Sequence, residues 1–261
     1  MSSYSKGKRT NIAPGLTTLG GYLNSDSRVA FVTGGTGGLG RIVTRALLES
    51  GVKVVTTYKR KAPLDELVAS LGGLSTNLMA VEADVTLEDD VKRAVGKAVE
   101  KHGRIDILLN IAGAYSGGRD IADTPLSELD SMLNTNLKTA FLCSSAVLPT
   151  MIQRNYGKIV NVAARPAVEK RYRAKSGAYA ISKAGVVVLT ETIAEEVKKY
   201  NINVNAIMPS TIATPDNRKN MPDADDSKWV KPEDITKVIL HLISDDSKVT
   251  SGAAVPVYGK A

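Results

Sequence analysis

The chain has 261 residues, a length that suits one large α/β domain and is short for two. Its single cysteine, Cys143, excludes an intramolecular disulfide, and two histidines far apart in sequence give no metal-ligand spacing, so we expect a reducing, cytoplasmic setting and no metal. The net charge of +7 favours an acidic partner, but aromatic residues are few and no nucleic-acid motif is present, which indicates a small anionic molecule or a solvated surface rather than nucleic acid.

The first 27 residues are polar and rich in Ser, Gly, Lys and Arg, which predicts an extension ahead of the fold, either a flexible arm or a strap over a neighbouring subunit. They lack the charged-then-apolar order of a secretory signal, and no apolar run in the chain approaches the length of a membrane span. We therefore expect an extension at 1–27, a single domain at 28–261, and no membrane partner.

Apolar runs and helical spacings alternate along the rest of the chain. This alternation predicts strands at 29–32, 52–57, 78–82, 105–110, 157–163, 203–208 and 254–258, with helices between them. Two of these helices are expected at 125–133 and 136–152, and the second has apolar residues on more than one face, as if it packed on the sheet and on a second subunit. The pattern predicts a seven-stranded, mainly parallel sheet with helices on both faces.

A glycine cluster joins the first strand to the first helix. Glycines there let the backbone approach a pyrophosphate and leave the helix N-terminus aiming free amides at negative charge. The alternative is an ordinary glycine-rich turn, but its position after the first strand of an alternating pattern favours dinucleotide binding. The residues assigned to this turn are Gly34, Thr36, Gly37, Gly38, Leu39 and Gly40.

The second strand leads into Tyr58, Lys59 and Arg60, with no acidic residue. In dinucleotide folds an acid at this place accepts hydrogen bonds from the ribose 2′-hydroxyl, whereas cations accommodate a 2′-phosphate. We therefore expect NADPH to be preferred, with NADH still possible and Lys59 and Arg60 as the main contacts. The alternative is an exposed basic loop without a ligand.

The third and fourth strands also end in candidate cofactor contacts. Asp84 and Val85 follow the third strand, where a carboxylate can accept from an adenine amino group, although Asp84 could instead cap the next helix. Asn110, Ala112 and Gly113 follow the fourth, where small residues let the chain pass close under a cofactor.

A helix that begins near Ser176 carries Tyr179 and Lys183 four residues apart, so the phenol and the ammonium share one face. A nearby cation favours phenolate and is expected to lower the pKa of Tyr179 from its usual value of about 10. The alternative is a surface pair. The fifth strand and a strongly basic loop at 165–175 directly precede this helix, which favours the catalytic interpretation.

These motifs together resemble the short-chain dehydrogenase/reductase family over about 28–260, on the glycine turn, the Asn110–Gly113 stretch, Asn136, and Tyr179 with Lys183. The resemblance implies a Rossmann-type, doubly wound fold with Tyr179 as general acid/base. It implies that Lys183 holds the nicotinamide ribose and that Asn136 supports a water relay to Lys183. We add Pro209 and Ile212, after the sixth strand, to the cofactor site, and expect a homodimer or homotetramer.

Two departures from the family pattern point to an unusual acceptor. Family members usually carry Ser three residues after the Asn of the fifth strand, whereas this chain has Ala164, and Ser176 from the following loop is a candidate to replace it. Residues 214–229 are similar to a segment of quinonoid dihydropteridine reductase, a branch that also lacks the Ser.

Three functions follow from this pattern. We favour an NAD(P)H-dependent reductase of an activated conjugated acceptor such as quinonoid dihydropterin, because its reduction does not create an alkoxide that needs the missing hydroxyl. The alternative is a reductase of 3-oxoacyl or other carbonyl substrates, in which the basic loop would hold an anionic group. The third is an NADP-binding regulatory protein with impaired catalysis, against which the retained Tyr179 and Lys183 argue.

Overall fold

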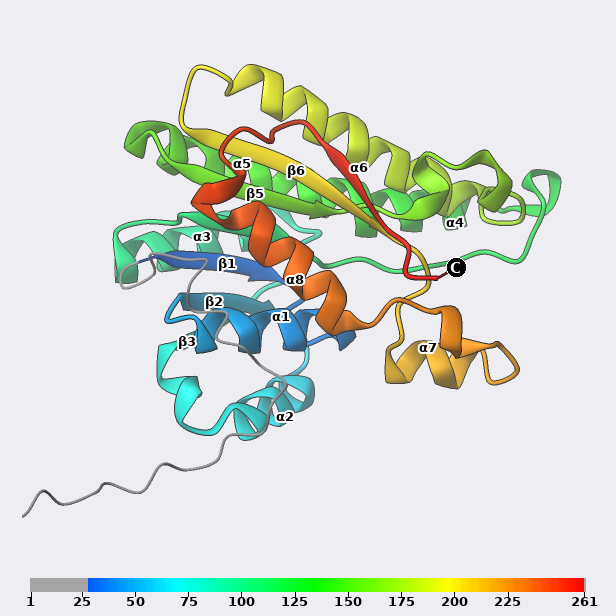
Figure 1. Cartoon of the computed structure of the whole chain (residues 1–261), viewed down its shortest axis with the longest axis horizontal. Coiled ribbons are helices and arrows are strands. Elements are labelled where there is room, and N and C mark those ends of the chain that lie inside the picture. The colour runs from blue at the N-terminus through cyan, green and yellow to red at the C-terminus, as the bar shows by residue number, and fades with distance from the viewer. Residues whose placement is uncertain (1–27, 261) are drawn as a thin grey trace, which may run out of the picture.

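Seven strands form the centre of the molecule in the computed structural model, which describes residues 28–260 (Figure 1). The strands are β1 Val29–Thr33, β2 Lys53–Tyr58, β3 Leu78–Glu82, β4 Ile107–Asn110, β5 Gly157–Val162, β6 Ile202–Pro209 and β7 Ala254–Val257. They pair in the order β3-β2-β1-β4-β5-β6-β7, and every pair is parallel. All seven predicted strands are confirmed, and the sheet is wholly rather than mainly parallel. The predicted extension at 1–27 lies outside the described residues.

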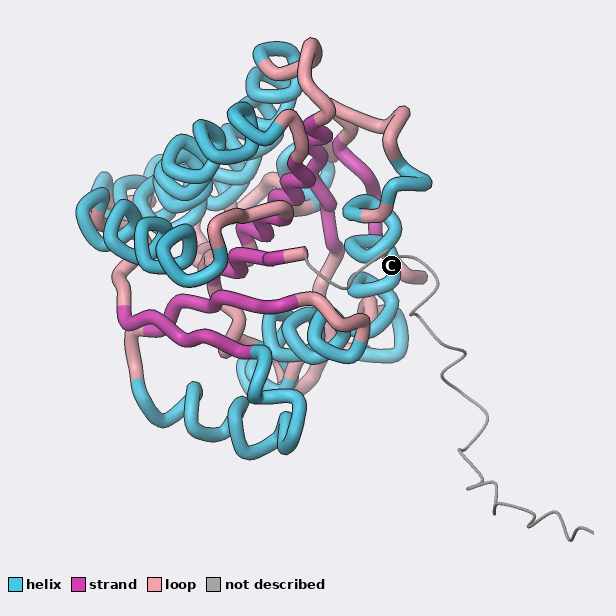
Figure 2. Tube along the Cα trace, turned by 90° about the vertical axis from the view of Figure 1, so that its left-hand side faces the viewer, coloured by secondary structure: helices cyan, strands magenta, loops and turns pink. Residues whose placement is uncertain are grey.

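Alternate residues of each strand face opposite sides of the sheet, and helices cover both sides (Figure 2). Ala30 and Val32 belong to one apolar cluster and Val29 and Phe31 to the other. The first cluster contains residues of α1 (Gly38–Glu49), α2 (Lys61–Leu71) and α8 (Pro232–Ile243), and the second contains residues of α3 (Glu88–His102), α5 (Thr139–Arg154) and α6 (Gly177–Glu196). Because both faces are covered, the strands read as continuous apolar runs.

The helix after β4 differs from its prediction. Helix α4 (Leu126–Met132) passes through a π-helical turn at Leu133–Lys138 directly into α5, so the expected break between two helices is absent from this segment. Helical dihedrals are kept at both ends of the π turn, at Met132 and at Thr139, so no loop separates the two helices. Asn136 lies in the π turn, a distortion that often accompanies a functional side chain.

The chain builds outward from β1 in both directions, because β2 and β3 lie on one side of β1 and β4 to β7 lie on the other. The connections after β1 and β4 therefore diverge at the carboxyl ends of two neighbouring strands. In open parallel sheets this switch point opens a crevice where ligands bind. The topology thus predicts the site between the ends of β1 and β4.

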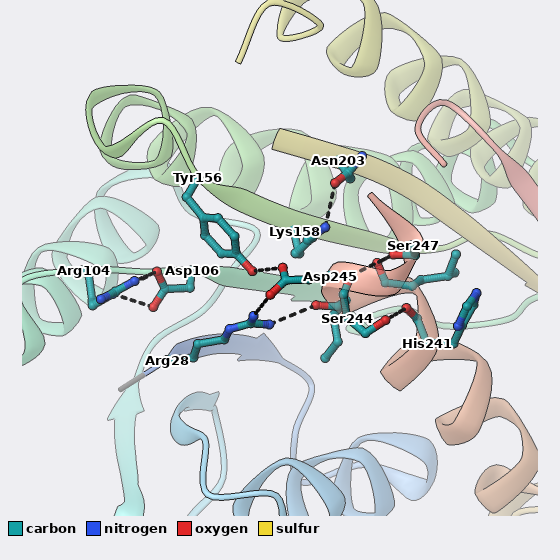
Figure 3. Close-up of polar contacts among 12 residues, drawn as sticks. Arg28, Arg104, Asp106, Tyr156, Lys158, Asn203, His241, Ser244, Asp245 and Ser247 are labelled. Atoms are coloured by element: carbon teal, nitrogen blue, oxygen red, sulfur yellow. Dashed lines mark hydrogen bonds and ion pairs between the residues drawn. The ribbon is translucent and has the colours of Figure 1, made fainter. Parts of the chain in front are cut away.

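Charged and polar contacts lie at the amino ends of the strands, on the side of the sheet opposite to the crevice (Figure 3). Arg28 pairs with Asp245, which also accepts from the Tyr156 hydroxyl at 2.9 Å. Asp106 accepts from the Val29 backbone N–H at 2.9 Å, so it fastens the start of β1. These contacts join the amino ends of the strands to the segment after α8 and lie away from the crevice.

No helix within residues 28–260 is both long and apolar enough to cross a membrane. The same residues contain no group of three or more His, Cys, Asp or Glu side chains arranged to hold a metal ion.

Helix α7 (Pro215–Asn220) lies between β6 and α8 along the chain and projects from the body of the molecule beside the carboxyl ends of the strands (Figure 1).

Candidate active site

The glycine turn after β1 folds so tightly that side chains would not fit. Gly34 has φ +69°, and its carbonyl accepts from the Gly37 N–H at 3.0 Å. A Cβ on Gly40 would lie 2.0 Å from the Gly34 oxygen, and one on Gly38 would lie 2.7 Å from the Thr214 methyl group. This cradle at the N-terminus of α1 fits a pyrophosphate, which the free amides there attract.

Thr33 and Asn110 hold the ends of β1 and β4 together. The Thr33 hydroxyl oxygen accepts from the Ile111 and Ala112 N–H groups at 3.1 and 3.2 Å. Asn110 is buried, and its amide donates to Asn161 Oδ1 at 2.8 Å. The Asn110 side chain therefore supports the crevice from below and does not line the cleft, so its contact with the cofactor stays a prediction, whereas Ala112 and Gly113 line the cleft.

Basic residues gather where β2 ends. Lys59 pairs with Asp84 at 2.7 Å, and Asp84 also accepts from the Thr86 N–H at 3.0 Å. These contacts lower the pKa of Asp84 to about 2 in spite of its burial. The Asp84 carboxylate thus orders the loop before α3. Asp84 does not line the cleft, so its contact with an adenine amino group stays a prediction. Lys59, Arg60 and Val85 do line the cleft.

Arg41, in the first turn of α1, lines the cleft beside Lys59 and Arg60, and sequence reasoning did not select it. Its guanidinium donates to the Thr36 carbonyl at 3.3 Å and pairs with Glu66 at 3.4 Å. Its Nε is buried without a hydrogen-bond partner among residues 28–260. Arg41 directly follows Gly40 in the glycine turn, and this position next to the turn is the sequence feature that could have identified it as a candidate cofactor contact.

Tyr179 and Lys183 lie on the same face of α6 and both line the cleft. Lys183 donates from Nζ to the Val162 carbonyl at 2.7 Å. Burial raises the pKa of Tyr179 well above its usual value, and the neighbouring Tyr115 raises it further, while burial lowers the pKa of Lys183 to about 8. The expected lowering of the Tyr179 pKa by Lys183 is therefore wrong for this arrangement, because desolvation dominates.

Asn136 stands behind Gly113 and close to Lys183. Its side chain accepts from the Ala114 N–H at 2.9 Å and donates to the Ala114 carbonyl and to Ser182 Oγ, both at 3.0 Å. A Cβ on Gly113 would lie 2.7 Å from Asn136 Oδ1 and 3.2 Å from Lys183 Nζ. The structure thus brings the predicted catalytic trio together, with Asn136 buried beneath the cleft and not in its lining.

The loop after β5 carries Ala164 as its second residue, and Ala164 lines the cleft. Ser176 also lines it, but its hydroxyl donates to the Tyr172 and Arg173 carbonyls, both at 3.1 Å. The buried Arg165 guanidinium lies over the Tyr172 ring at 3.9 Å, and Arg173 donates to the Pro166 and Ala167 carbonyls. Several basic side chains of this loop therefore hold the loop itself.

The cleft that these elements enclose has a volume of about 1240 Å³. Sixteen of the residues assigned from sequence line it: Gly34, Thr36, Gly37, Gly38, Leu39, Gly40, Tyr58, Lys59, Arg60, Val85, Ala112, Gly113, Tyr179, Lys183, Pro209 and Ile212. It is also lined by residues that sequence reasoning did not assign, among them Arg41, Glu66, Tyr115, Arg165, Thr214 and Met221. The last two come from 214–229, so this segment forms part of the wall.

A glycine cradle, a buried lysine and a partly buried phenol in one cleft define a dinucleotide-dependent oxidoreductase of Rossmann type. A family model described as short chain dehydrogenase matches residues 28–225. The chain therefore belongs to the short-chain dehydrogenase/reductase family, whose members use NAD(P)H.

Known proteins resemble the chain over nearly its whole length. A 3-oxoacyl-(acyl-carrier-protein) reductase of Thermotoga maritima is 34% identical over 244 residues, which is 90% of this chain and 97% of that protein. The structure of ElxO with NADP bound is 25% identical with a TM-score of 0.85, and covers 89% of this chain and 98% of its own. NAD⁺-bound xylitol dehydrogenase is 27% identical with a TM-score of 0.82, and covers 90% and 99%.

Proposed function

We propose that the protein is an NADPH-preferring carbonyl reductase in which Tyr179 donates the proton. The observation that carries this proposal is the placing of Tyr179 and Lys183 in the same cleft as the glycine cradle. A bound nicotinamide would supply the hydride. A phenol whose pKa is raised by burial keeps its proton at neutral pH, which suits a group that must give a proton to a developing alkoxide.

Lys183 and Asn136 support this step. The Lys183 ammonium, fixed against the Val162 carbonyl, can donate to a nicotinamide ribose. The Asn136 amide is anchored to Ala114 and fixes the backbone next to Gly113, so the floor of the cleft is rigid. These roles predict that Tyr179→Phe lowers kcat by at least roughly a hundredfold while the Kd for NADPH stays within about threefold. Unchanged turnover of a true substrate by Tyr179→Phe would refute the proposal.

The preference for NADPH rests on three cations, Arg41, Lys59 and Arg60, and on the lack of an acid at the end of β2. Hydrogen bonds to a charged group contribute about 1.5 to 3 kcal/mol, so Arg60→Ala is expected to raise the KM for NADPH by roughly tenfold or more. The KM for NADH should not change. The neighbouring Lys61, which pairs with Asp65 at 2.8 Å, provides the control: Lys61→Ala should leave both values unchanged. Equal effects of Arg60→Ala on both cofactors would refute the preference.

The substrate class rests on the relatives and on the cleft. The resemblance to a 3-oxoacyl reductase supports a carbonyl substrate more than a quinonoid dihydropterin. A quinonoid acceptor stays a second candidate, because Ala164 offers no hydroxyl to an alkoxide and residues of 214–229 line the cleft. NADPH oxidation with a 3-oxo ester and with chemically generated quinonoid dihydropterin separates the two. Turnover of the pterin alone would replace the first candidate by the second.

Assembly and location are further parts of the proposal. Phe141 on α5 and Ile181 and Val188 on α6 leave large apolar side chains about half exposed, which supports a homodimer or homotetramer through these helices. Light scattering of Val188→Glu beside the unsubstituted protein tests this, and an unaltered mass would count against that surface. The single, buried Cys143 supports the cytoplasm as the working compartment.

A further inference from the structure

Tyr115 presents a large aromatic side chain to the cleft in which Tyr179 lies. Its residue surface is 66% exposed, and it lines the cleft. Its ring meets the Tyr179 ring edge to face, with the centroids 5.0 Å apart and the planes at 76°. An exposed aromatic ring in contact with a proton donor offers apolar surface at the place where a substrate must sit.

The loop that carries Tyr115 is fastened to the start of α6. The Gly118 N–H donates to the Lys175 carbonyl at 2.6 Å, and Arg119 pairs with Ser176 in an isolated bridge. A Cβ on Gly117 would lie 2.5 Å from the Tyr115 hydroxyl oxygen, so only glycine lets the ring lie where it does. Because α6 carries Tyr179, these contacts hold the loop of Tyr115 against the start of the helix that carries the proton donor.

A second tyrosine of the cleft shows the contrast. Tyr172 is 38% exposed, but the Arg165 and Arg171 guanidinium groups lie over its ring at 3.9 and 4.8 Å. Among residues 28–260 the structure records no cation over the Tyr115 ring and no aromatic contact to it besides Tyr179. The Tyr115 ring therefore retains surface that a ligand can cover.

Resting on the proposed function, we propose that Tyr115 is the platform of the substrate site and selects planar, conjugated ring ketones and quinones. The flat ring of the substrate stacks on Tyr115, and its carbonyl oxygen is directed at the Tyr179 hydroxyl. Ala164 and Pro166 add apolar surface to the same cleft, which suits a flat ring better than a charged chain. A bound reduced nicotinamide would supply the hydride to the carbonyl carbon, and the carbonyl oxygen takes the proton of Tyr179, which leaves an alcohol and the Tyr179 phenolate.

The test compares Tyr115→Leu and Tyr115→Phe on two substrates, phenanthrenequinone and ethyl acetoacetate, with NADPH as donor. Leu removes the aromatic face and keeps an apolar side chain, whereas Phe removes only the hydroxyl. We expect Tyr115→Leu to raise the KM for the quinone roughly tenfold, because the aromatic stack is lost, and to raise the KM for the acyclic ester by a smaller factor, so that the ratio of kcat/KM for the quinone to that for the ester falls roughly fivefold or more. Tyr115→Phe should keep the quinone KM within about threefold. NADPH binding, measured by fluorescence, should be the same in all three proteins.

The outcomes separate this inference from the proposed function. Equal effects of Tyr115→Leu on both substrates, or none on either, would overturn the platform while turnover that depends on Tyr179 leaves the reductase intact. A Phe variant as impaired as the Leu variant would also overturn it, because the hydroxyl and not the ring would then act. If the unsubstituted protein binds NADPH and reduces neither substrate, or if Tyr179→Phe reduces both at the original rate, the proposed function fails and the platform with it.

Discussion

Replacing Gly113 by alanine tests how tightly the floor of the cleft is built. The added methyl group would lie 2.7 Å from Asn136 Oδ1 and 3.2 Å from Lys183 Nζ. Real Cβ atoms do not approach oxygen so closely, so the Asn136 side chain must move. Asn136 is 1% exposed and lies in the π turn, so it has little room to do so.

The cost follows from the hydrogen bonds that Asn136 would lose. Its amide makes one bond to the Ala114 N–H, one to the Ala114 carbonyl and one to Ser182 Oγ, at 2.9, 3.0 and 3.0 Å. A hydrogen bond contributes about 1 kcal/mol net, and more when its partner is left buried and unpaired. We therefore expect Gly113→Ala to lower the free energy of unfolding by about 2 to 3 kcal/mol and kcat/KM by roughly tenfold or more.

The same substitution at Gly96 is the matched control. Gly96 lies in the exposed middle of α3, and a Cβ there would meet no atom within 4 Å. Gly96→Ala should keep full activity and raise the free energy of unfolding by about 0.5 to 1 kcal/mol, the difference in helix propensity. Urea unfolding followed by circular dichroism and steady-state kinetics measure both variants. The reasoning would be refuted if Gly113→Ala matched Gly96→Ala in midpoint and in kcat/KM.

Three further predictions concern the site and its support. The kcat/KM for reduction should be constant below pH 8 and fall about tenfold per pH unit above it, because the pKa of Lys183 is about 8 and only its ammonium form can donate a hydrogen bond. A kcat/KM that stays constant up to pH 10 would contradict this. Ala164→Ser should raise kcat for the acyclic 3-oxo ester by roughly tenfold or more, since it adds a donor for the alkoxide; an unchanged kcat would show that the hydroxyl does not reach it. Tyr156→Phe should lower the free energy of unfolding by about 1 kcal/mol, because it removes the 2.9 Å hydrogen bond to Asp245. Activity should not change, because that contact lies at the amino ends of the strands, away from the crevice. A loss of activity would contradict this separation of the contact from the active site.

The sequence by itself determined the order of the strands along the chain and most of the cofactor cleft. Apolar runs such as 29–32 are buried on both faces, so their pattern is local and needs no knowledge of partners. Glycine turns carry the same local signal, because Gly34 and Gly40 occupy positions that a Cβ would block. Tyr179 and Lys183 share a helical face through their spacing alone. Each of these features depends only on residues that are close together in the sequence.

Only the tertiary structure decided which of the polar side chains face the cleft. Asn110 ends β4 and Asp84 follows β3, as expected, yet Asn110 bonds to Asn161 on β5 and Asp84 pairs with Lys59, because the nearest partners come from distant segments. The raised pKa of Tyr179 has the same origin, since burial depends on every element around it. The contact of the Tyr115 ring with Tyr179 also depends on the tertiary structure, because it requires the loop of Tyr115 to pack against the start of α6. Local spacing sets secondary structure, whereas burial, electrostatics and the contacts between loops arise from the packing of elements far apart in sequence.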